Sequence, residues 1–107
     1  MATTKDFVDY VCDHIQAFGI ITSKRMFGEY MVYINAKPIL LICDNTVYLK
    51  MKDEIKEYME DAQTGTPYEG AKEHYILDIE DYDITSKVLP ILESITLLPK
   101  PRKNKSE

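Results

Sequence analysis

No stretch of this chain is long and apolar enough to be read as a membrane span. A helix that crosses a bilayer needs about 20 consecutive apolar residues, whereas the longest apolar run, residues 38–43, has the length of a strand. The first residues, MATTKDF, also lack the apolar segment of a secretory signal peptide. We therefore expect a soluble, cytoplasmic protein that does not bind membranes.

Cysteine is scarce as well. The chain contains two, Cys12 and Cys43. In a protein that is expected to stay in a reducing compartment, such residues are free thiols that pack in the interior. Zinc is not expected on Cys12 and His14, because residues two apart point to different sides of a helix. The sequence predicts no bound metal.

Familiar catalytic motifs are missing too. There is no G-x-S-x-G nucleophile elbow, no G-x-x-x-x-G-K-[ST] phosphate loop and no G-x-G-x-x-G dinucleotide fingerprint. The carboxylates in residues 78–83 suggest calcium, but that segment lacks the glycine and the distal glutamate of an EF-hand. We therefore predict a protein that is not an enzyme and that uses no cofactor and no small-molecule substrate.

What the chain does contain is enough for one domain. With 107 residues and 45% hydrophobic residues, it can build one core without disulfides or metal. The net charge of −5 is uneven, because residues 100–107 are basic and the rest is acidic. An acidic body repels nucleic-acid phosphates, while a short basic tail could contact them weakly. We predict a domain over residues 1–99 and a flexible basic tail over residues 100–107.

Hydrophobic periodicity predicts the elements of the first half. A helix is expected over residues 4–18, with Gly19 as its stop. Tight turns are expected at residues 35–38 and at residues 44–45, and short connections of this kind favour antiparallel hairpins. The strands of this half are expected over residues 30–34, 39–43 and 47–51, the last with Val47, Leu49 and Met51 on its buried face.

The second half continues with alternating helices and strands. Asp53 is expected to cap a second helix, and residues 64–70 to form a loop. A strand over residues 74–79 precedes a third helix, whose start at Thr85 or Ser86 would leave Pro90 near the first turn. The element order, helix, three or four strands, helix, one or two strands, helix, predicts a two-layer α+β sandwich with an antiparallel sheet of about five strands.

Tyrosine is abundant, with eight in the chain. An aromatic surface with lysines can stack on bases or serve in a protein interface. It can also simply cover a small sheet with its hydroxyl groups in water, and the sequence leaves these alternatives open. The candidate interaction face consists of Tyr33, Tyr48, Lys50, Lys52 and Tyr75.

Two short blocks give the chain a family resemblance. The first is RMFGEY, residues 25–30, in which Met26 and Phe27 are expected to anchor a strand and Gly28 to allow a bulge or a close backbone approach. The second is the strand segment Tyr48-Leu49-Lys50. The motif residues are Arg25, Met26, Phe27, Gly28, Tyr30, Tyr48, Leu49 and Lys50.

On these residues the chain resembles the N-terminal domain of TfoX/Sxy proteins, which are bacterial regulators linked to competence for natural transformation. The resemblance covers roughly residues 5–103. It implies a secretion-chaperone-like α+β fold and a non-enzymatic, regulatory role. Full-length TfoX proteins carry a second, helical domain that this sequence lacks, so the fold carries over more directly than the competence function.

The resulting functional hypothesis is a regulatory interaction domain that binds a protein partner or a second copy of itself. The alternative is an accessory protein that binds nucleic acid through Lys24, Arg25 and the lysines and tyrosines of the candidate interaction face, together with the basic tail.

Overall fold

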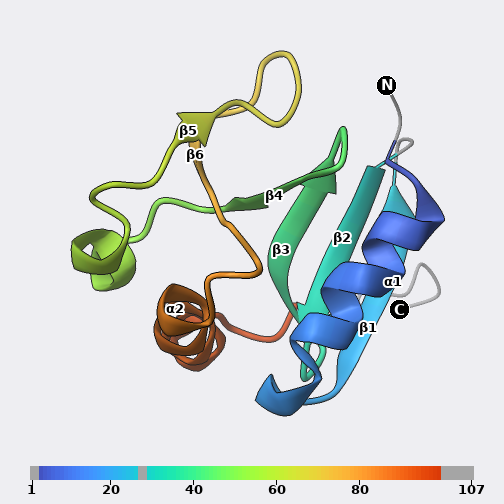
Figure 1. The fold of residues 1–107 in the computed structure, drawn as a ribbon, viewed down its shortest axis with the longest axis horizontal. Coiled ribbons are helices and arrows are strands. Elements are labelled where there is room, and N and C mark those ends of the chain that lie inside the picture. The colour runs from blue at the N-terminus through green and yellow to red at the C-terminus, as the bar shows by residue number, and fades with distance from the viewer. Residues whose placement is uncertain (1–2, 27–28, 100–107) are drawn as a thin grey trace, which may run out of the picture.

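The computed structural model describes residues 3–26 and 29–99, which form an α+β domain with helices and one antiparallel sheet (Figure 1). The predicted fold class is confirmed. None of the helices in these two ranges has both the length and the apolarity to cross a membrane. In chain order the elements are α1 (Lys5–His14), the 3₁₀ helix η1 (Gln16–Phe18), β1 (Ile21–Met26), β2 (Glu29–Ile34), β3 (Lys37–Cys43), β4 (Thr46–Leu49), the 3₁₀ helix η2 (Asp53–Tyr58), β5 (Thr64–Gly65), β6 (His74–Ile76) and α2 (Tyr82–Ile95).

The sheet has six strands in the order β1-β2-β3-β4-β6-β5, all paired antiparallel. The turns at Asn35-Ala36 and Asp44-Asn45 have positive φ at all four residues, between 52° and 68°. Two-residue turns of this hand match the twist of the strands they join, so they make tight hairpins. Both predicted hairpins are confirmed. The sheet has one strand more than the five or so predicted, because β5 lies in the segment over residues 64–70 that was predicted to be a loop.

Helix α1 begins at its cap, Thr4, whose hydroxyl accepts a hydrogen bond from the amide of Phe7 at 3.2 Å. It lies over β1 and β2 (Figure 1) and buries Val8 and Val11 completely. The predicted helix over residues 4–18 is confirmed, except that its last turn is the 3₁₀ helix η1. Gly19 ends this segment with a φ of 145°, a value that favours glycine.

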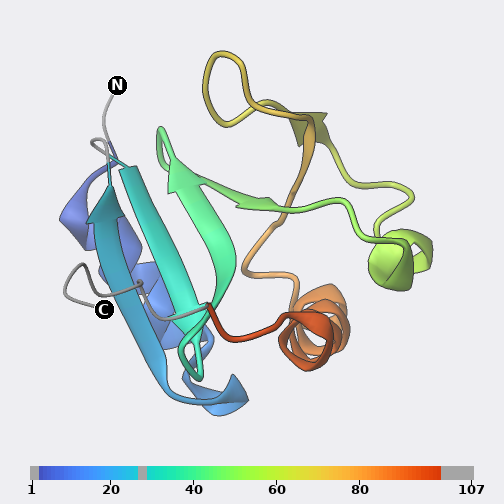
Figure 2. The ribbon, with the colours of Figure 1, turned by 180° about the vertical axis from the view of Figure 1, so that it is seen from behind.

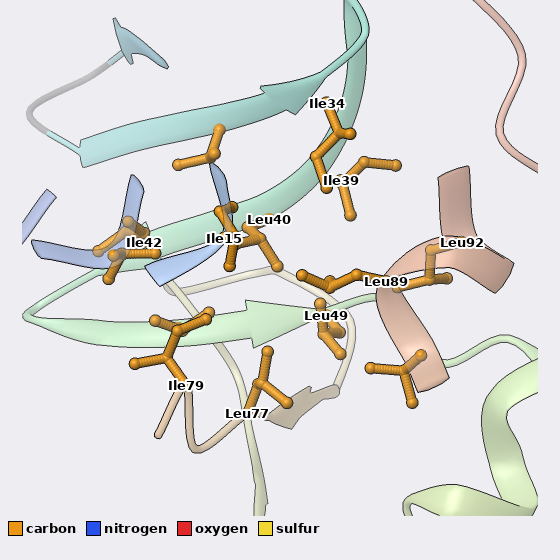
Figure 3. Close-up of a cluster of buried hydrophobic side chains, with 14 of the residues drawn as sticks. Ile15, Ile34, Ile39, Leu40, Ile42, Leu49, Leu77, Ile79, Leu89 and Leu92 are labelled. Carbon is orange, nitrogen blue, oxygen red and sulfur yellow. The ribbon is translucent and has the colours of Figure 1, made fainter. Parts of the chain in front are cut away.

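Helix α2 closes the other side of the core. Leu89 lies between Leu40 of β3 and Leu49 of β4 in Figure 3, and all three side chains are fully buried. The start predicted at Thr85 or Ser86 is wrong. Asp81 caps the helix instead, and its side chain accepts a hydrogen bond from the amide of Ile84 at 3.3 Å.

This earlier start moves Pro90 into the interior of α2. Pro90 is exposed, so its ring does not displace core side chains. It still provides no amide hydrogen for the carbonyl four residues earlier. The helix tolerates this loss because its other face is anchored in the core by Val88, Leu89 and Leu92.

Two more predictions need correction. The segment after Asp53 is a 3₁₀ helix, held by i→i+3 hydrogen bonds such as that from the Ile55 amide to the Lys52 carbonyl at 3.1 Å. It still buries Ile55, and Met59, which follows its last residue, is buried as well. Strand β4 ends at Leu49, so Met51, predicted to continue the buried face, is 41% exposed.

The predicted strand over residues 74–79 is also shorter, since β6 ends at Ile76. Leu77 still bonds to the neighbouring strand, with its amide donating to the Val47 carbonyl at 2.9 Å. Beyond it the chain turns, because the amide of Asp81 bonds back to the carbonyl of Asp78 at 3.0 Å.

The RMFGEY block lies at a hairpin. Met26 ends β1, Glu29 begins β2, and the two residues face each other in the register. The block therefore spans the end of β1 and the start of β2. The sequence indicated instead that it begins the first strand of the sheet. The strand before it was missed because β1 is an edge strand, mostly exposed and polar. Phe27 and Gly28 lie outside the described residues.

Candidate functional site

The two faces of the sheet have different roles. Val32 and Leu40 are partners in the β2–β3 register and lie on the core side, where both are fully buried. The next residues along these strands, Met31 and Leu41, therefore point to the opposite side. Leu41 also pairs with Tyr48 of β4, so Met31, Leu41 and Tyr48 form a row across three strands. Seen from behind, β1 to β3 stand in front of α1, so α1 does not lie over this part of that face (Figure 2).

This row is part of the lining of a hollow of about 670 Å³, which we call the open-face hollow. The segment that follows β4 contributes Lys50 and Lys52, and the segment before β6 contributes Tyr68 and Lys72. Strand β3 adds Ile39, and α2 adds Leu92. The hollow thus combines an apolar floor with a rim drawn from segments that are distant in the sequence.

The rim is basic although the chain as a whole is acidic. Lys50, Lys52 and Lys72 line the hollow together with Glu73, whereas the net charge of the chain is −5. The Glu73 carboxylate accepts a hydrogen bond from the Thr64 hydroxyl at 2.5 Å. Within the described ranges, none of the three lysines has a carboxylate at ion-pairing distance. Their charges are therefore available to an anionic ligand.

Other lysines of the same chain are paired. Lys5 lies 3.0 Å from Asp9 in α1, and Lys37 lies 3.2 Å from Glu93 in α2. Lys37 also donates to the backbone carbonyl of Glu93 at 2.8 Å. Some lysines of the described ranges therefore form ion pairs, whereas Lys50, Lys52 and Lys72 form none with a described carboxylate.

Tyr48 is half-buried in the wall of the hollow. Its ring meets that of His74 edge-on, with the centroids 6.3 Å apart and an interplanar angle of 88°. Gly65 of β5 lies beside the tyrosine ring, since a Cβ there would be 3.6 Å from it, an ordinary van der Waals distance. Burial raises the pKa of the Tyr48 hydroxyl, so the phenol stays neutral and remains a hydrogen-bond donor.

His74 is oriented from the other side. One of its ring nitrogens, Nδ1, lies 2.8 Å from the backbone carbonyl of Lys72. Because this contact joins residues two positions apart, it restrains the ring relative to its own segment. The aromatic pair therefore gives the hollow a preformed wall, while Tyr68, 59% exposed, stands at its rim.

The structure brings together part of the predicted interaction face. Tyr48, Lys50 and Lys52 all line the open-face hollow. Tyr33 alternates with Val32 on β2, so it shares the open face without lining the hollow. Tyr75 lies on the core side, because it pairs with the fully buried Leu49 and packs against the core.

The predicted motif residues are spread over both faces. Tyr30 and Leu49 pack on the core side, whereas Lys50 reaches the hollow. Arg25 is exposed on the edge strand β1. Sequence reasoning missed Tyr68, Lys72 and His74, since only the pairing of β6 with β4 places them beside Tyr48.

Other reactive groups lie apart from the hollow. Cys43 is 1% exposed, and burial raises the pKa of its thiol to about 11. Cys12 is half-buried, and burial raises its pKa as well. In the part of the chain that the structure describes, no three His, Cys, Asp or Glu side chains gather closely enough to hold a metal ion.

Two comparisons with known proteins bear on this site. The family model described as the TfoX N-terminal domain matches residues 13–88, a span that includes all six strands and most of the hollow. An uncharacterized 12.7 kDa protein in the trpE 5′ region of Spirochaeta aurantia is 33% identical over 109 residues. That similarity covers 100% of this chain and 95% of the Spirochaeta protein.

Proposed function

Because the chain belongs to the TfoX N-terminal domain family, we propose that it is a non-enzymatic regulatory domain that binds a protein partner through the open-face hollow. The family supports the regulatory part of this proposal, since TfoX proteins are regulators linked to competence. The observation that carries the binding part is the hollow itself, with an apolar floor and a polar rim.

This arrangement has the anatomy of a protein interface. Such interfaces have an apolar centre enriched in tyrosine and methionine, surrounded by polar residues that stay in water. In the hollow, Met31, Leu41 and Tyr48 are only half-buried, and Lys50 and Lys52 at the rim are exposed. A partner would complete the burial of the floor without any change in the sheet.

The composition of the lining favours binding over catalysis. Among its described residues there is no serine, cysteine or aspartate. His74 is engaged through Nδ1 with the Lys72 carbonyl, and Glu73 is engaged with Thr64. This lining supports the non-enzymatic part of the proposal, because covalent catalysis requires a nucleophile and a base within hydrogen-bond reach of each other.

The test uses two tyrosines that are equally exposed. Tyr68 at the rim and Tyr82 at the start of α2 are both 59% exposed, and only Tyr68 lines the hollow. A photo-crosslinking phenylalanine derivative in place of Tyr68 should trap a defined protein in the native host, identified by mass spectrometry. The same derivative in place of Tyr82 should not trap that protein.

A second candidate function is binding of single-stranded nucleic acid. Three lysines beside the rings of Tyr48, Tyr68 and His74 favour it, since cationic grooves with aromatic platforms bind such strands. The net charge of −5 opposes it. Crosslinks from position 68 to nucleic acid instead of protein would establish this second function, and crosslinks from neither would overturn both.

A further inference from the structure

We propose that the partner segment that occupies the open-face hollow is an acidic peptide carrying at least one large apolar side chain. This inference rests on the proposed function and gives the chemistry of the partner. It follows from two properties of the hollow, the positive charge of its rim and the apolar surface of its floor. A single ligand must complement both.

The basic rim of the hollow favours a negatively charged ligand. Lys50 and Lys52 follow one strand and Lys72 precedes another, so their charges reach the hollow from separate segments. None of them is paired with a carboxylate of the described ranges, and the one acidic residue among the described lining residues, Glu73, is hydrogen-bonded to Thr64. An anionic segment would therefore form its ion pairs without first breaking existing ones.

The apolar floor of the hollow favours a ligand with an apolar side chain. Met31 and Leu41 line the hollow and are half-buried, and Met51 at the rim is 41% exposed. Methionine side chains are flexible and polarizable, so they adapt to side chains of different shapes. A hollow of about 670 Å³ is large enough for a side chain together with a short stretch of backbone.

The chain itself does not offer a suitable occupant. Its acidic segments are part of its own fold: residues 53–61 bury Ile55 and Met59 in the core, and residues 78–83 are held by hydrogen bonds. Asp78 accepts from the Glu80 amide at 3.1 Å, Asp81 caps α2, and Glu80 accepts a hydrogen bond from the Tyr10 hydroxyl. The tail, residues 100–107, has the same sign of charge as the rim. A second copy of this chain is therefore a poorer match than a different protein.

Nucleic acid matches only half of the site. Its phosphates would suit the lysines, but much of the floor is aliphatic, whereas single strands are held by stacking on rings. The acidic body would also repel a longer strand that leaves the hollow. A carboxylate peptide brings fewer charges than a nucleic acid and an apolar side chain for the floor, so it fits both parts.

The test selects the ligand without assuming its sequence. The full chain is immobilised and a random library of phage-displayed 12-residue peptides is selected on it. We expect the enriched peptides to carry Asp or Glu next to Leu, Phe or Trp. A synthetic, fluorescein-labelled copy of an enriched peptide then gives a dissociation constant by fluorescence polarisation.

Two double variants locate the binding and test its charge. Lys50→Glu with Lys72→Glu reverses the rim and should weaken binding at least about tenfold. Lys56→Glu with Lys87→Glu makes the same change in net charge at exposed lysines outside the hollow and should leave the affinity within about twofold. A peptide whose acidic residues are replaced by lysine should bind the rim-reversed variant better than it binds the wild type.

The possible outcomes separate the inference from the proposed function. Enriched peptides that bind in the hollow but are neutral or basic overturn the inference and leave the function standing. An acidic peptide whose affinity is the same in both double variants binds elsewhere and overturns the inference, but the proposed function still depends on the crosslink from position 68. A failure to enrich any peptide overturns the inference, while the crosslink from position 68 still decides the function. If a dT12 oligonucleotide binds more tightly than the peptide, and the rim-reversed variant no longer binds it, nucleic-acid binding replaces both the inference and the proposed function.

Discussion

The hydroxyl of Thr3 donates a hydrogen bond of 2.7 Å to the carboxylate of Glu29. This contact joins the residue before the cap of α1 to the first residue of β2. The same carboxylate oxygen accepts the amide of Asp44 at 3.1 Å, and the amide of Asn45 donates to the Thr3 hydroxyl at 3.3 Å. Glu29 therefore links the start of α1, the start of β2 and the β3–β4 turn.

We expect Glu29→Ala to lower the free energy of unfolding by about 1 to 3 kcal/mol, because hydrogen bonds to a charged group are lost and donors are left unpaired. Glu29→Gln keeps an acceptor oxygen and should cost less. Urea denaturation measures both. The exposed Glu60 serves as the control, and a loss at Glu60→Ala equal to that at Glu29→Ala would contradict the role of the link.

A second link predicts a pH dependence. Hydrogen bonds from Lys37 and then from Asn35 lower the pKa of Glu93 below its usual value. A carboxylate whose pKa is depressed by folding adds stability that is complete above its unfolded pKa, about 4.3, and that disappears as the pH falls through the folded pKa. The difference in melting temperature between wild type and Glu93→Gln should therefore be present at neutral pH and shrink in acid.

Lys37→Met separates this effect from general acid sensitivity. It removes the ammonium group while keeping much of the apolar length of the side chain. Its melting temperature should respond to acid as that of Glu93→Gln does, because either change breaks the same pair. If the melting-temperature difference between either variant and the wild type were the same below pH 4 as at neutral pH, the Lys37–Glu93 pair would not be its source.

The cysteines give a prediction about reactivity. The thiolate is the reactive form, and the pKa of Cys43, about 11, leaves little of it at neutral pH. Cys43 is also 1% exposed, whereas Cys12 is half-buried. Iodoacetamide should label Cys12 in the native protein well before Cys43, and both at similar rates in concentrated guanidinium. Mass spectrometry after timed quenching reads the two sites separately, and equal native rates would contradict the burial of Cys43.

Local sequence signals predicted the first half of the fold well. Asn35, Asp44 and Asn45 mark their turns, because Asn and Asp accept positive φ more readily than most residues, and the helix expected over residues 4–18 begins after its cap, Thr4. These features depend on the backbone preferences and hydrogen bonds of a few neighbouring residues, so they can be predicted from a short stretch of sequence. The antiparallel pairing of β2, β3 and β4 follows from the short turns.

The candidate site could be predicted only in part, because it depends on pairings between distant segments. Tyr48, Lys50 and Lys52 are neighbours in the sequence and were assigned to one face, and all three line the hollow. Tyr75 was assigned to the same face, but the register of β4 with β6 places it opposite Leu49, on the core side. The short β6 has no alternation pattern long enough to show which of its faces is buried.

The position of Pro90 supports one more prediction, on stability. Pro90 lies inside α2 and is exposed, so it removes a backbone hydrogen bond without adding core packing. Pro90→Ala restores an amide that can donate to the Ser86 carbonyl and should raise the free energy of unfolding by about 1 to 3 kcal/mol. Urea denaturation measures the gain, with Lys87→Ala at another exposed position of α2 as a control that should change little. A loss of stability in Pro90→Ala would show that the packing of α2 depends on the local geometry that the proline imposes.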